Sequence, residues 1–379
     1  MAPQTAVAAV LERFNEPLAL REFEIPVAAP GAIVVEIDVA TVCGSDLHVW
    51  ANHLGPTYTL PLPMVAGHEM VGAIVALGSG SDVDSLGNLL RVGDRVVWAN
   101  EGCQRCYVCT IEREPRLCPS RKFVGLTSSV QPPHFTGAFA EYGYIFPGQQ
   151  RLRVDDAVRS EWASAGSCAL RSVINTVEAA GGIDFLDSVV VQGSGPLGLF
   201  ATAIVATFNP KHLVVVGAPS ERLRLAEAWG ATHTVSIEEH PSGEARREVI
   251  GSITGLGGPS VVLEVSGAPG AVAEGVAMLR ANGRYVLSGT IGGGPQPIDM
   301  SRVTTRGLHL RGSMSGDIDS YYKAMEFLLR FRGRFDWDLM LGNRYGLHQV
   351  ADALESMRDL HEIKPVIDPK LTVMSLSLC

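Results

Sequence analysis

The chain of 379 residues carries 31 basic and 40 acidic side chains, which gives a formal net charge of −9 at pH 7. This charge argues against nucleic acid as the main partner, because binding to phosphates needs a basic surface. Hydrophobic residues make up 46% and charged residues 19% of the chain, as in globular proteins that build sizeable cores in two domains. We see no secretory signal and no apolar run near the roughly 20 residues that span a bilayer. We therefore expect a cytoplasmic protein with no membrane partner.

The first part of the chain, to about residue 160, has the pattern of short strands. Residues 32–40 partly alternate apolar and polar side chains, as a half-buried strand does, and residues 71–77 and 95–98 look similar. Glycine and proline punctuate the connections between them. We expect a β-rich domain with long functional loops.

From about Trp162 the pattern changes to strands that alternate with helices. The expected strands are residues 189–192, 213–216, 261–265 and 285–288, and the expected helices are residues 196–208, 221–229 and 271–279. Such alternation predicts a parallel sheet with helices on both faces. After about residue 311 we expect two helices, at 320–331 and 348–357, and a strand near 364–367 that returns to the first domain.

One stretch of the β-rich part, T-V-C-G-S-D-L-H at residues 41–48, concentrates reactive side chains. It could be an ordinary polar turn. Together with G-H-E at residues 67–69, however, Cys43 and His68 form a three-ligand set with the more distant Cys168. Three protein ligands leave the fourth zinc position open, which is the catalytic arrangement. Cys168 could instead be a small core residue, and the sequence alone leaves the convergence of the three open.

Four clustered cysteines give a second metal signal. The spacing is C-x2-C-x2-C-x8-C, at Cys103, Cys106, Cys109 and Cys118. Four thiolates on one loop, with no open position, suit a closed structural zinc site. A redox role for C-x-x-C is the alternative, but the thioredoxin-like context is missing. The odd total of seven cysteines also speaks against a disulfide framework.

A glycine fingerprint, G-S-G-P-L-G, follows the apolar run at residues 189–191 and opens an expected helix. Gly193 permits the tight turn, Gly195 lets a pyrophosphate approach the backbone, and Gly198 allows close packing of helix and strand. Pro196 and Leu197 begin the helix whose N-terminus would meet the phosphates. The simpler alternative is a glycine-rich turn without a ligand.

The choice between NAD and NADP depends on the end of the next strand. An acidic residue there would bind the adenosine ribose of NAD, but Gly217 holds that position. A 2′-phosphate therefore meets no repulsion, and Ser220, Arg222 or Arg224 could bind it. Both arginines could equally lie on a solvated helix face. The sequence thus predicts NAD(P), with a slight preference for NADP.

These motifs resemble the zinc-containing alcohol dehydrogenases of the medium-chain dehydrogenase/reductase superfamily, over nearly the whole chain. The resemblance is carried by C-G-S-D-L-H (43–48), G-H-E-M-V-G (67–72), G-D-R-V (93–96), the four-cysteine lobe, G-A-F-A-E-Y (137–142) and G-S-G-P-L-G (193–198). It implies an α/β protein with a GroES-like, partly open β-barrel catalytic domain, at about 1–160 and 312–379, and a Rossmann doubly wound parallel sheet at about 161–311.

The resemblance also implies roles for individual residues. Cys43, His68 and Cys168 look like catalytic zinc ligands, Glu69 like an acid that can approach the metal, and Asp46 like the carboxylate that orients His68. Ser45 and His48 match a proton relay. Ser172 matches a residue on the nicotinamide side, and Lys364 a basic residue on the pyrophosphate. Arg171 departs from the small residue expected near Cys168; it could reach an anionic substrate, join an interdomain salt bridge or lie in solvent.

The implied function is hydride transfer between an alcohol, polyol or hydroxy compound and NAD(P), with one catalytic and one structural zinc ion. The family forms homodimers and homotetramers, and the sequence does not choose between them. Three alternatives stay open: a zinc-independent quinone or enoyl reductase of the same superfamily, a non-catalytic nucleotide-binding protein, and a zinc-dependent binding module built on the four-cysteine lobe.

Overall fold

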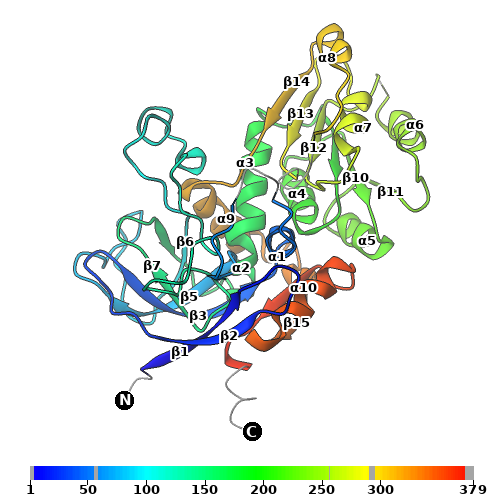
Figure 1. Cartoon of the computed structure of the whole chain (residues 1–379). Helices are drawn as coiled ribbons and strands as arrows, with labels where there is room; N and C mark the ends of the chain where they lie inside the picture. The colour runs from blue at the N-terminus through cyan, green and yellow to red at the C-terminus, as the bar shows by residue number, and fades with distance from the viewer. Residues whose placement is uncertain (1–3, 55–58, 256, 290–294, 372–379) are drawn as a thin grey trace. The chain divides into compact units, whose positions relative to one another are not determined.

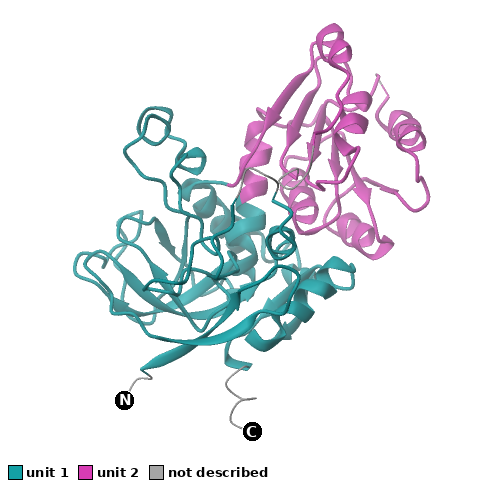
Figure 2. Ribbon diagram, viewed as in Figure 1, with its two compact units in different colours: residues 1–171, 316–379 teal, residues 172–315 magenta. Residues whose placement is uncertain are grey.

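The chain forms two compact units in the computed structural model, which describes residues 4–54, 59–255, 257–289 and 295–371. Unit 1 contains residues 1–171 and 316–379, and unit 2 contains residues 172–315 (Figure 2). These units divide the chain at 171/172 and 315/316. The domain limits that the sequence suggests, at 160/161 and 311/312, remain a prediction about the family's domains.

Unit 1 is built from two β-sheets (Figure 1). The smaller sheet has the order β2-β1-β4, with bounds Ala19–Glu24, Thr5–Leu11 and Met64–Val65. The larger sheet has the order β15-β16-β3-β5-β6-β8, with β7 paired to β3; the bounds are Leu341–Tyr345, Lys364–Ile367, Ile33–Thr41, Met70–Leu77, Arg95–Trp98, Arg151–Arg153 and, for β7, Tyr142–Ile145. Strand β16 runs antiparallel to β3, with Val366 opposite Thr41. The C-terminal segment therefore returns to the first part of the chain, as predicted.

Short helices complete unit 1. They are α1 (Gly44–Trp50), η1 (Val108–Glu112), η2 (Pro115–Leu117), α2 (Ser160–Ala165), η3 (Gly166–Leu170), α9 (Ile318–Phe331), η4 (Trp337–Met340), η5 (Leu347–Gln349) and α10 (Val350–Arg358). The two helices expected after residue 311 correspond to α9 and α10. Among all described residues, no helix has the length and apolar composition to cross a membrane.

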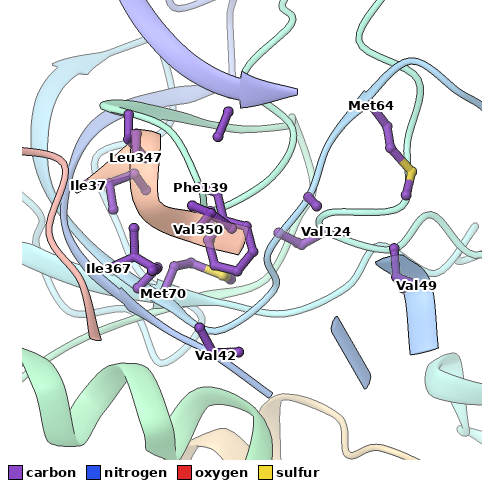
Figure 3. Packing of buried hydrophobic residues seen from close by; sticks show 14 of the residues in the cluster. Ile37, Val42, Val49, Met64, Met70, Val124, Phe139, Leu347, Val350 and Ile367 are labelled. Atoms are coloured by element: carbon purple, nitrogen blue, oxygen red, sulfur yellow. The ribbon is translucent and has the colours of Figure 1, made fainter. Parts of the chain in front are cut away.

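The main core of unit 1 contains the apolar side chains of β3 and α10. Strand β3, I-V-V-E-I-D-V-A-T, buries most of its side chains, and Ile37 lies in the same apolar cluster as Met70, Phe139, Val350 and Ile367 (Figure 3). Burial of each such side chain contributes about 1.5–3 kcal/mol. In the same cluster, Val42 directly precedes Cys43 and Val49 lies in α1 directly after His48, so the core anchors the reactive stretch near both of its ends.

Unit 2 contains one sheet of six parallel strands. Their order is β11-β10-β9-β12-β13-β14, with bounds His233–Ser236, His212–Gly217, Ser188–Gln192, Val261–Glu264, Arg284–Leu287 and His309–Gly312. The helices are α3 (Arg171–Ala179, whose first residue belongs to unit 1), α4 (Pro196–Thr207), α5 (Ser220–Ala228), α6 (Gly243–Thr254), α7 (Ala271–Met278) and α8 (Met300–Arg306). The central strands β9 and β12 are fully buried valine-rich runs, as a parallel sheet covered on both faces requires. The predicted fold class, a partly open β-barrel with a Rossmann sheet, is confirmed.

The sequence did not reveal five elements of unit 2, namely α3, β11, α6, α8 and β14. Strands β11 and β14 are the two edges of the sheet, and their sequences H-T-V-S and H-L-R-G carry few buried side chains. Helices α6 and α8 are largely polar, with two and no buried residues respectively. Edge strands and exposed helices lack the continuous apolar pattern on which the prediction of this domain depended.

Candidate zinc and cofactor sites

The first candidate metal site brings together residues from three separate segments of unit 1. Cys43 precedes α1, His68 and Glu69 precede β5, and Cys168 lies in η3. One ligand atom from each of the four lies within 4.8 Å of every other. Two thiols, an imidazole and a carboxylate are donors that zinc accepts in tetrahedral sites. The donor set therefore fits zinc, and the structure brings Cys168 to the other two ligands.

Asp46 organises this site from the first turn of α1. One of its carboxylate oxygens lies 2.9 Å from Nδ1 of His68, and the other accepts a hydrogen bond of 2.9 Å from the backbone N–H of Cys43. Burial alone would lower the pKa of His68, but the Asp46 carboxylate outweighs it and raises that pKa. A histidine whose Nδ1 is held in this way presents Nε2 to a metal. The expected contact between Asp46 and His68 is therefore present.

The two thiols of the site, Cys43 and Cys168, shift each other's pKa. Contact with Cys168 is the largest effect on Cys43 and, together with burial, raises the pKa of Cys43 to about 12. The same contact lowers the pKa of Cys168, and the Arg171 guanidinium adds to this shift. The two thiols thus lie close enough to interact, and a divalent cation would bind both of them as thiolates.

Glu69 lies close to the three candidate metal ligands and pairs with a buried lysine. Its Oε2 forms an ion pair with Nζ of Lys364 and accepts a hydrogen bond of 2.6 Å from Thr41 Oγ1. Its Oε1 is buried without a hydrogen-bond partner. Burial raises the pKa of Glu69 to about 8, against the attraction of the Lys364 ammonium. A buried, unsatisfied carboxylate oxygen beside three ligands fits the role of a group that can approach the metal.

The role on the pyrophosphate that the resemblance implies for Lys364 remains a prediction, and the structure places this lysine in a buried ion pair. Both side chains of the Lys364–Glu69 pair have no exposed surface, and Nζ also donates to the carbonyl of Val42 at 3.0 Å. A fully buried ammonium in this pair would have to break the pair to reach a pyrophosphate, which would leave a buried charge unpaired. Thr41, which also contacts Ser164 Oγ at 3.0 Å, was missed, because nothing in a lone threonine signals that it binds a buried carboxylate.

Ser45 and His48 lie on one side of α1, since residues three apart are neighbours on a helix. Both are partly exposed, whereas Asp46 between them is buried. Burial lowers the pKa of His48, and the positive charge that His53 can carry lowers it further. His48 is therefore neutral near pH 7 and has a free base site to accept a proton.

Arg171 lies inside unit 1 rather than in solvent. Its side chain is 4% exposed. Nε donates to the carbonyl of Ser167 at 2.7 Å, one terminal nitrogen donates to the carbonyl of Gly316 at 3.4 Å, and the guanidinium carbon lies 5.0 Å from the ring centroid of Tyr321. Within unit 1, Arg171 is thus a buried structural cation next to the turn that carries Cys168.

The four-cysteine lobe forms the second candidate metal site. The ligand atoms of Cys103, Cys106, Cys109 and Cys118 also lie within 4.8 Å of one another, and all four cysteines are free. The backbone N–H groups of Cys103 and Cys109 point to the sulfurs of Cys118 and Cys106, each at 3.4 Å. Such donors stabilise negative charge on sulfur. Four thiols in this arrangement fit a closed tetrahedral zinc site.

The fingerprint loop of unit 2 has the shape that a dinucleotide needs. Gly193 has a φ of +121°, which favours glycine. A Cβ on Gly198 would lie 1.9 Å from the carbonyl oxygen of Gly193, so this close approach of helix and loop requires glycine. Around Gly195, the residue before Pro196 and Leu197 at the start of α4, a Cβ would meet no atom within 4 Å. The loop thus leaves open space at the N-terminus of α4, where phosphates bind favourably.

Ser194 leaves no room for a side chain at Gly217, the last residue of β10. A Cβ at position 217 would lie 2.2 Å from Ser194 Oγ, and that hydroxyl is held by both the N–H and the carbonyl of Ala218, at 3.1 and 2.9 Å. Arg222 is 6% exposed, and burial lowers its pKa. Arg224 is exposed and pairs with Glu221 at 2.9 Å. Of the two arginines, only Arg224 therefore has the solvated position that the sequence offered as the alternative.

Ser172 is the first residue of unit 2 and is 8% exposed. Its carbonyl accepts a hydrogen bond of 2.8 Å from Thr176 Oγ1. This bond follows the helical turn of α3 and fixes the backbone of Ser172 rather than its hydroxyl. The role of Ser172 on the nicotinamide side remains a prediction.

Comparison with known proteins agrees with this site chemistry. Residues 29–156 match the alcohol dehydrogenase GroES-like domain, and residues 196–330 match the zinc-binding dehydrogenase domain. The chain is 32% identical over 372 residues to 5-exo-hydroxycamphor dehydrogenase of Pseudomonas putida, covering 97% of this chain and 100% of that protein. It is 28% identical to sorbitol dehydrogenase of Bacillus subtilis, covering 93% and 94%.

Solved structures give the same result. An alcohol dehydrogenase from Thermotoga maritima shares 31% identity with a TM-score of 0.89, over 97% of this chain and 100% of that one. An alcohol dehydrogenase from E. coli in complex with NADH shares 25% identity with a TM-score of 0.80, again over 97% and 100%. The chain belongs to the zinc-containing alcohol dehydrogenase family of the medium-chain dehydrogenase/reductase superfamily and is a zinc-dependent, NAD(P)-dependent oxidoreductase that acts on alcohols.

Proposed function

We propose that Cys43, His68 and Cys168 hold the catalytic zinc and that the four-cysteine lobe holds a structural zinc. The observation that carries this proposal is the convergence of two thiols and an imidazole from three segments, with Asp46 orienting the imidazole. Three ligands leave one position for the substrate oxygen, whereas four thiols in the lobe leave none. Glu69, whose Oε1 is free of protein partners, is the group that exchanges with the substrate position.

The residues of α1 handle the proton of the substrate hydroxyl. When bound, zinc supplies a Lewis acid that makes this hydroxyl more acidic, and NAD(P)⁺ accepts the hydride. Ser45 accepts the proton from the hydroxyl and passes it toward His48, whose lowered pKa keeps it neutral and ready to accept. The substrate carbon loses a hydride and its oxygen loses a proton, which yields the carbonyl product, NAD(P)H and one proton.

The substrate proposed here is a secondary alcohol, polyol or hydroxy compound. The named substrates of relatives support this class, because 5-exo-hydroxycamphor and the C3 hydroxyl of L-threonine both carry the hydroxyl on a carbon with two carbon neighbours. A zinc-independent quinone or enoyl reductase is not favoured, since the named relatives act on alcohols. A non-catalytic protein is not favoured for the same reason.

NADP is the preferred cofactor of this proposal. Ser194 fills the space beside Gly217 where NAD-specific sites carry a carboxylate, so no negative charge repels a 2′-phosphate, and Arg222 follows on α5. We further propose that the protein is cytoplasmic and forms a homodimer or a homotetramer. Light scattering of the purified protein would decide between the two oligomeric states.

Turnover with NAD and with NADP tests the function directly. Reduced nicotinamide is followed by absorbance against a panel of secondary alcohols, polyols and anionic hydroxy compounds, with the Cys43→Ser variant as control. The proposal expects turnover with one class of alcohol, a higher kcat/KM with NADP, and a severe loss in the variant. Full activity in Cys43→Ser would contradict the zinc mechanism.

A further inference from the structure

Cys168 lies in a turn of unusual geometry. The segment η3, Gly166–Leu170, is a π-helical turn that separates α2 from α3. At its end, the backbone N–H of Arg171 donates to the carbonyl of Gly166, five residues back, and to that of Cys168. In an α-helix this N–H would bond to Ser167, four residues back. π turns cost stability and are found mostly at functional sites. We therefore looked for interactions that stabilise this turn.

The side chain of Arg171 donates to the carbonyl of Ser167, which in an α-helix would accept from the backbone N–H of Arg171. Nε of Arg171 donates to the carbonyl of Ser167 at 2.7 Å. The hydroxyl of Ser167 in turn accepts from the backbone N–H of Met70, at 3.2 Å, and donates to the carbonyl of Ser164, at 2.8 Å. Hydrogen bonds therefore hold both the carbonyl and the hydroxyl of Ser167, the residue that directly precedes Cys168.

The other end of the Arg171 side chain is anchored to the start of α9. A terminal nitrogen donates to the carbonyl of Gly316, and the guanidinium faces the ring of Tyr321, which is 2% exposed. Helix α9 also packs closely on the turn: a Cβ on Gly166 would lie 2.8 Å from Leu328 Cδ1 and 3.0 Å from Met325 Cε. The side chain of Arg171 thus links the turn, at the carbonyl of Ser167, to the start of α9.

We propose that Arg171 is a positioning residue for the metal ligand Cys168, because it locks the π turn that aims this thiol at Cys43 and His68. The inference rests on the proposed function, in which these three residues bind zinc. If the turn relaxed to an α-helix, the register would shift by one residue, and one residue corresponds to a rotation of about 100° around the helix axis. Such a rotation takes the sulfur away from the other two ligands.

Zinc affinity tests this role without relying on turnover. Two variants of the full chain, Arg171→Met and Arg171→Lys, are compared with the wild type by chelator competition for zinc, and with cobalt(II) as a spectroscopic probe of thiolate coordination. Folding is checked by circular dichroism. If Arg171→Met does not fold, Arg171→Lys keeps the positive charge but lacks the planar fork that reaches Ser167 and Gly316 together. Arg358→Met, at an exposed arginine of the same unit, is the matched control.

We expect both Arg171 variants to bind the zinc at the Cys43 site about 10–100-fold more weakly, as residues that orient metal ligands typically do when removed. The cobalt absorbance of this site should change, while the four-cysteine lobe keeps its own zinc and Arg358→Met behaves as the wild type. Zinc affinity within about twofold of the wild type, with an unchanged cobalt spectrum, would overturn the role of Arg171. If the wild type binds no metal that Cys43→Ala removes, the proposed function itself fails, which is a separate result.

Discussion

The ammonium of Lys364 pairs with the carboxylate of Glu69, and neither side chain has any exposed surface. Lys364 lies on β16, which the pairing with β3 brings close to the candidate metal ligands, and Nζ also donates to the carbonyl of Val42. Glu69 thus has a permanent cation on one side and the cysteine and histidine ligands on the other. Burial raises the pKa of Glu69 to about 8, and the Lys364 ammonium opposes this effect of burial without cancelling it.

The first prediction concerns this pair. Lys364→Met removes the cation and leaves Glu69 buried without its partner, so unfolding free energy should fall by about 3–5 kcal/mol. Thermal or urea unfolding of the purified variant measures the loss. The double variant Lys364→Met/Glu69→Gln should recover part of it, because an amide in place of the carboxyl group has no need of the lost cation. If the double variant is as unstable as the sum of both single variants, the pair is not coupled in the way described.

The second prediction concerns the proton relay. His48→Ala should lower kcat by about 10²-fold or less, because general acid–base assistance is typically worth about 10²–10⁴-fold and water can substitute in part. Steady-state kinetics as a function of pH measures the effect and should show the loss of the group that titrates below neutral pH. His361→Ala, at an exposed histidine of the same unit, is the control. An unchanged kcat and pH profile in His48→Ala would exclude the relay.

The third prediction concerns cofactor choice. Gly217→Asp alone should weaken binding of both cofactors, because the new side chain collides with Ser194 Oγ. In Ser194→Gly/Gly217→Asp the space is open, and the carboxylate should repel a 2′-phosphate and bind the ribose of NAD. We expect the ratio of the two Kd values to move toward NAD by tenfold or more, which corresponds to about 1.4 kcal/mol or more. Fluorescence titration measures both Kd values, and an unmoved ratio would show that discrimination lies elsewhere.

The fourth prediction concerns acid stability in unit 2. Asp187 accepts hydrogen bonds from Ser260 Oγ at 2.6 Å and from Arg284 at 2.9 Å. Burial works to raise the pKa of Asp187, but these donors outweigh it and the pKa is lowered. A carboxylate with a lowered folded pKa adds stability above its unfolded pKa, about 3.9, and this stability is lost as pH falls below that value.

Asp187→Asn should therefore be less stable at neutral pH, by on the order of 1–3 kcal/mol, since hydrogen bonds to a charged group are lost. The difference from the wild type should shrink as pH falls below about 4. Urea unfolding at several pH values measures it, with Glu238→Gln, at an exposed acid of the same unit, as the control. A difference that is constant down to the lowest pH would contradict the assignment.

The residue types of the candidate sites could be predicted from the sequence, whereas the contacts between residues distant in the chain could not. The ligand types and the glycine spacing can be read from single residues and short motifs, because thiols, imidazoles and a Gly193-to-Gly198 turn have few other uses in those patterns. The sequence did not show that Lys364 pairs with Glu69, because the two residues lie 295 positions apart and only the pairing of β16 with β3 makes them neighbours. Arg171 gave no signal of its burial, because a π turn has no sequence pattern that periodicity detects.

The central claim of this account is that Cys43, His68 and Cys168 hold one zinc ion and that the four-cysteine lobe holds another. The most direct test is the zinc content per chain, measured by elemental analysis of the purified wild type and of Cys168→Ala. The account predicts two zinc ions in the wild type and one in the variant, with the lobe site retained. Two zinc ions in both proteins would show that Cys168 is not needed to hold the metal, and would contradict the site described here.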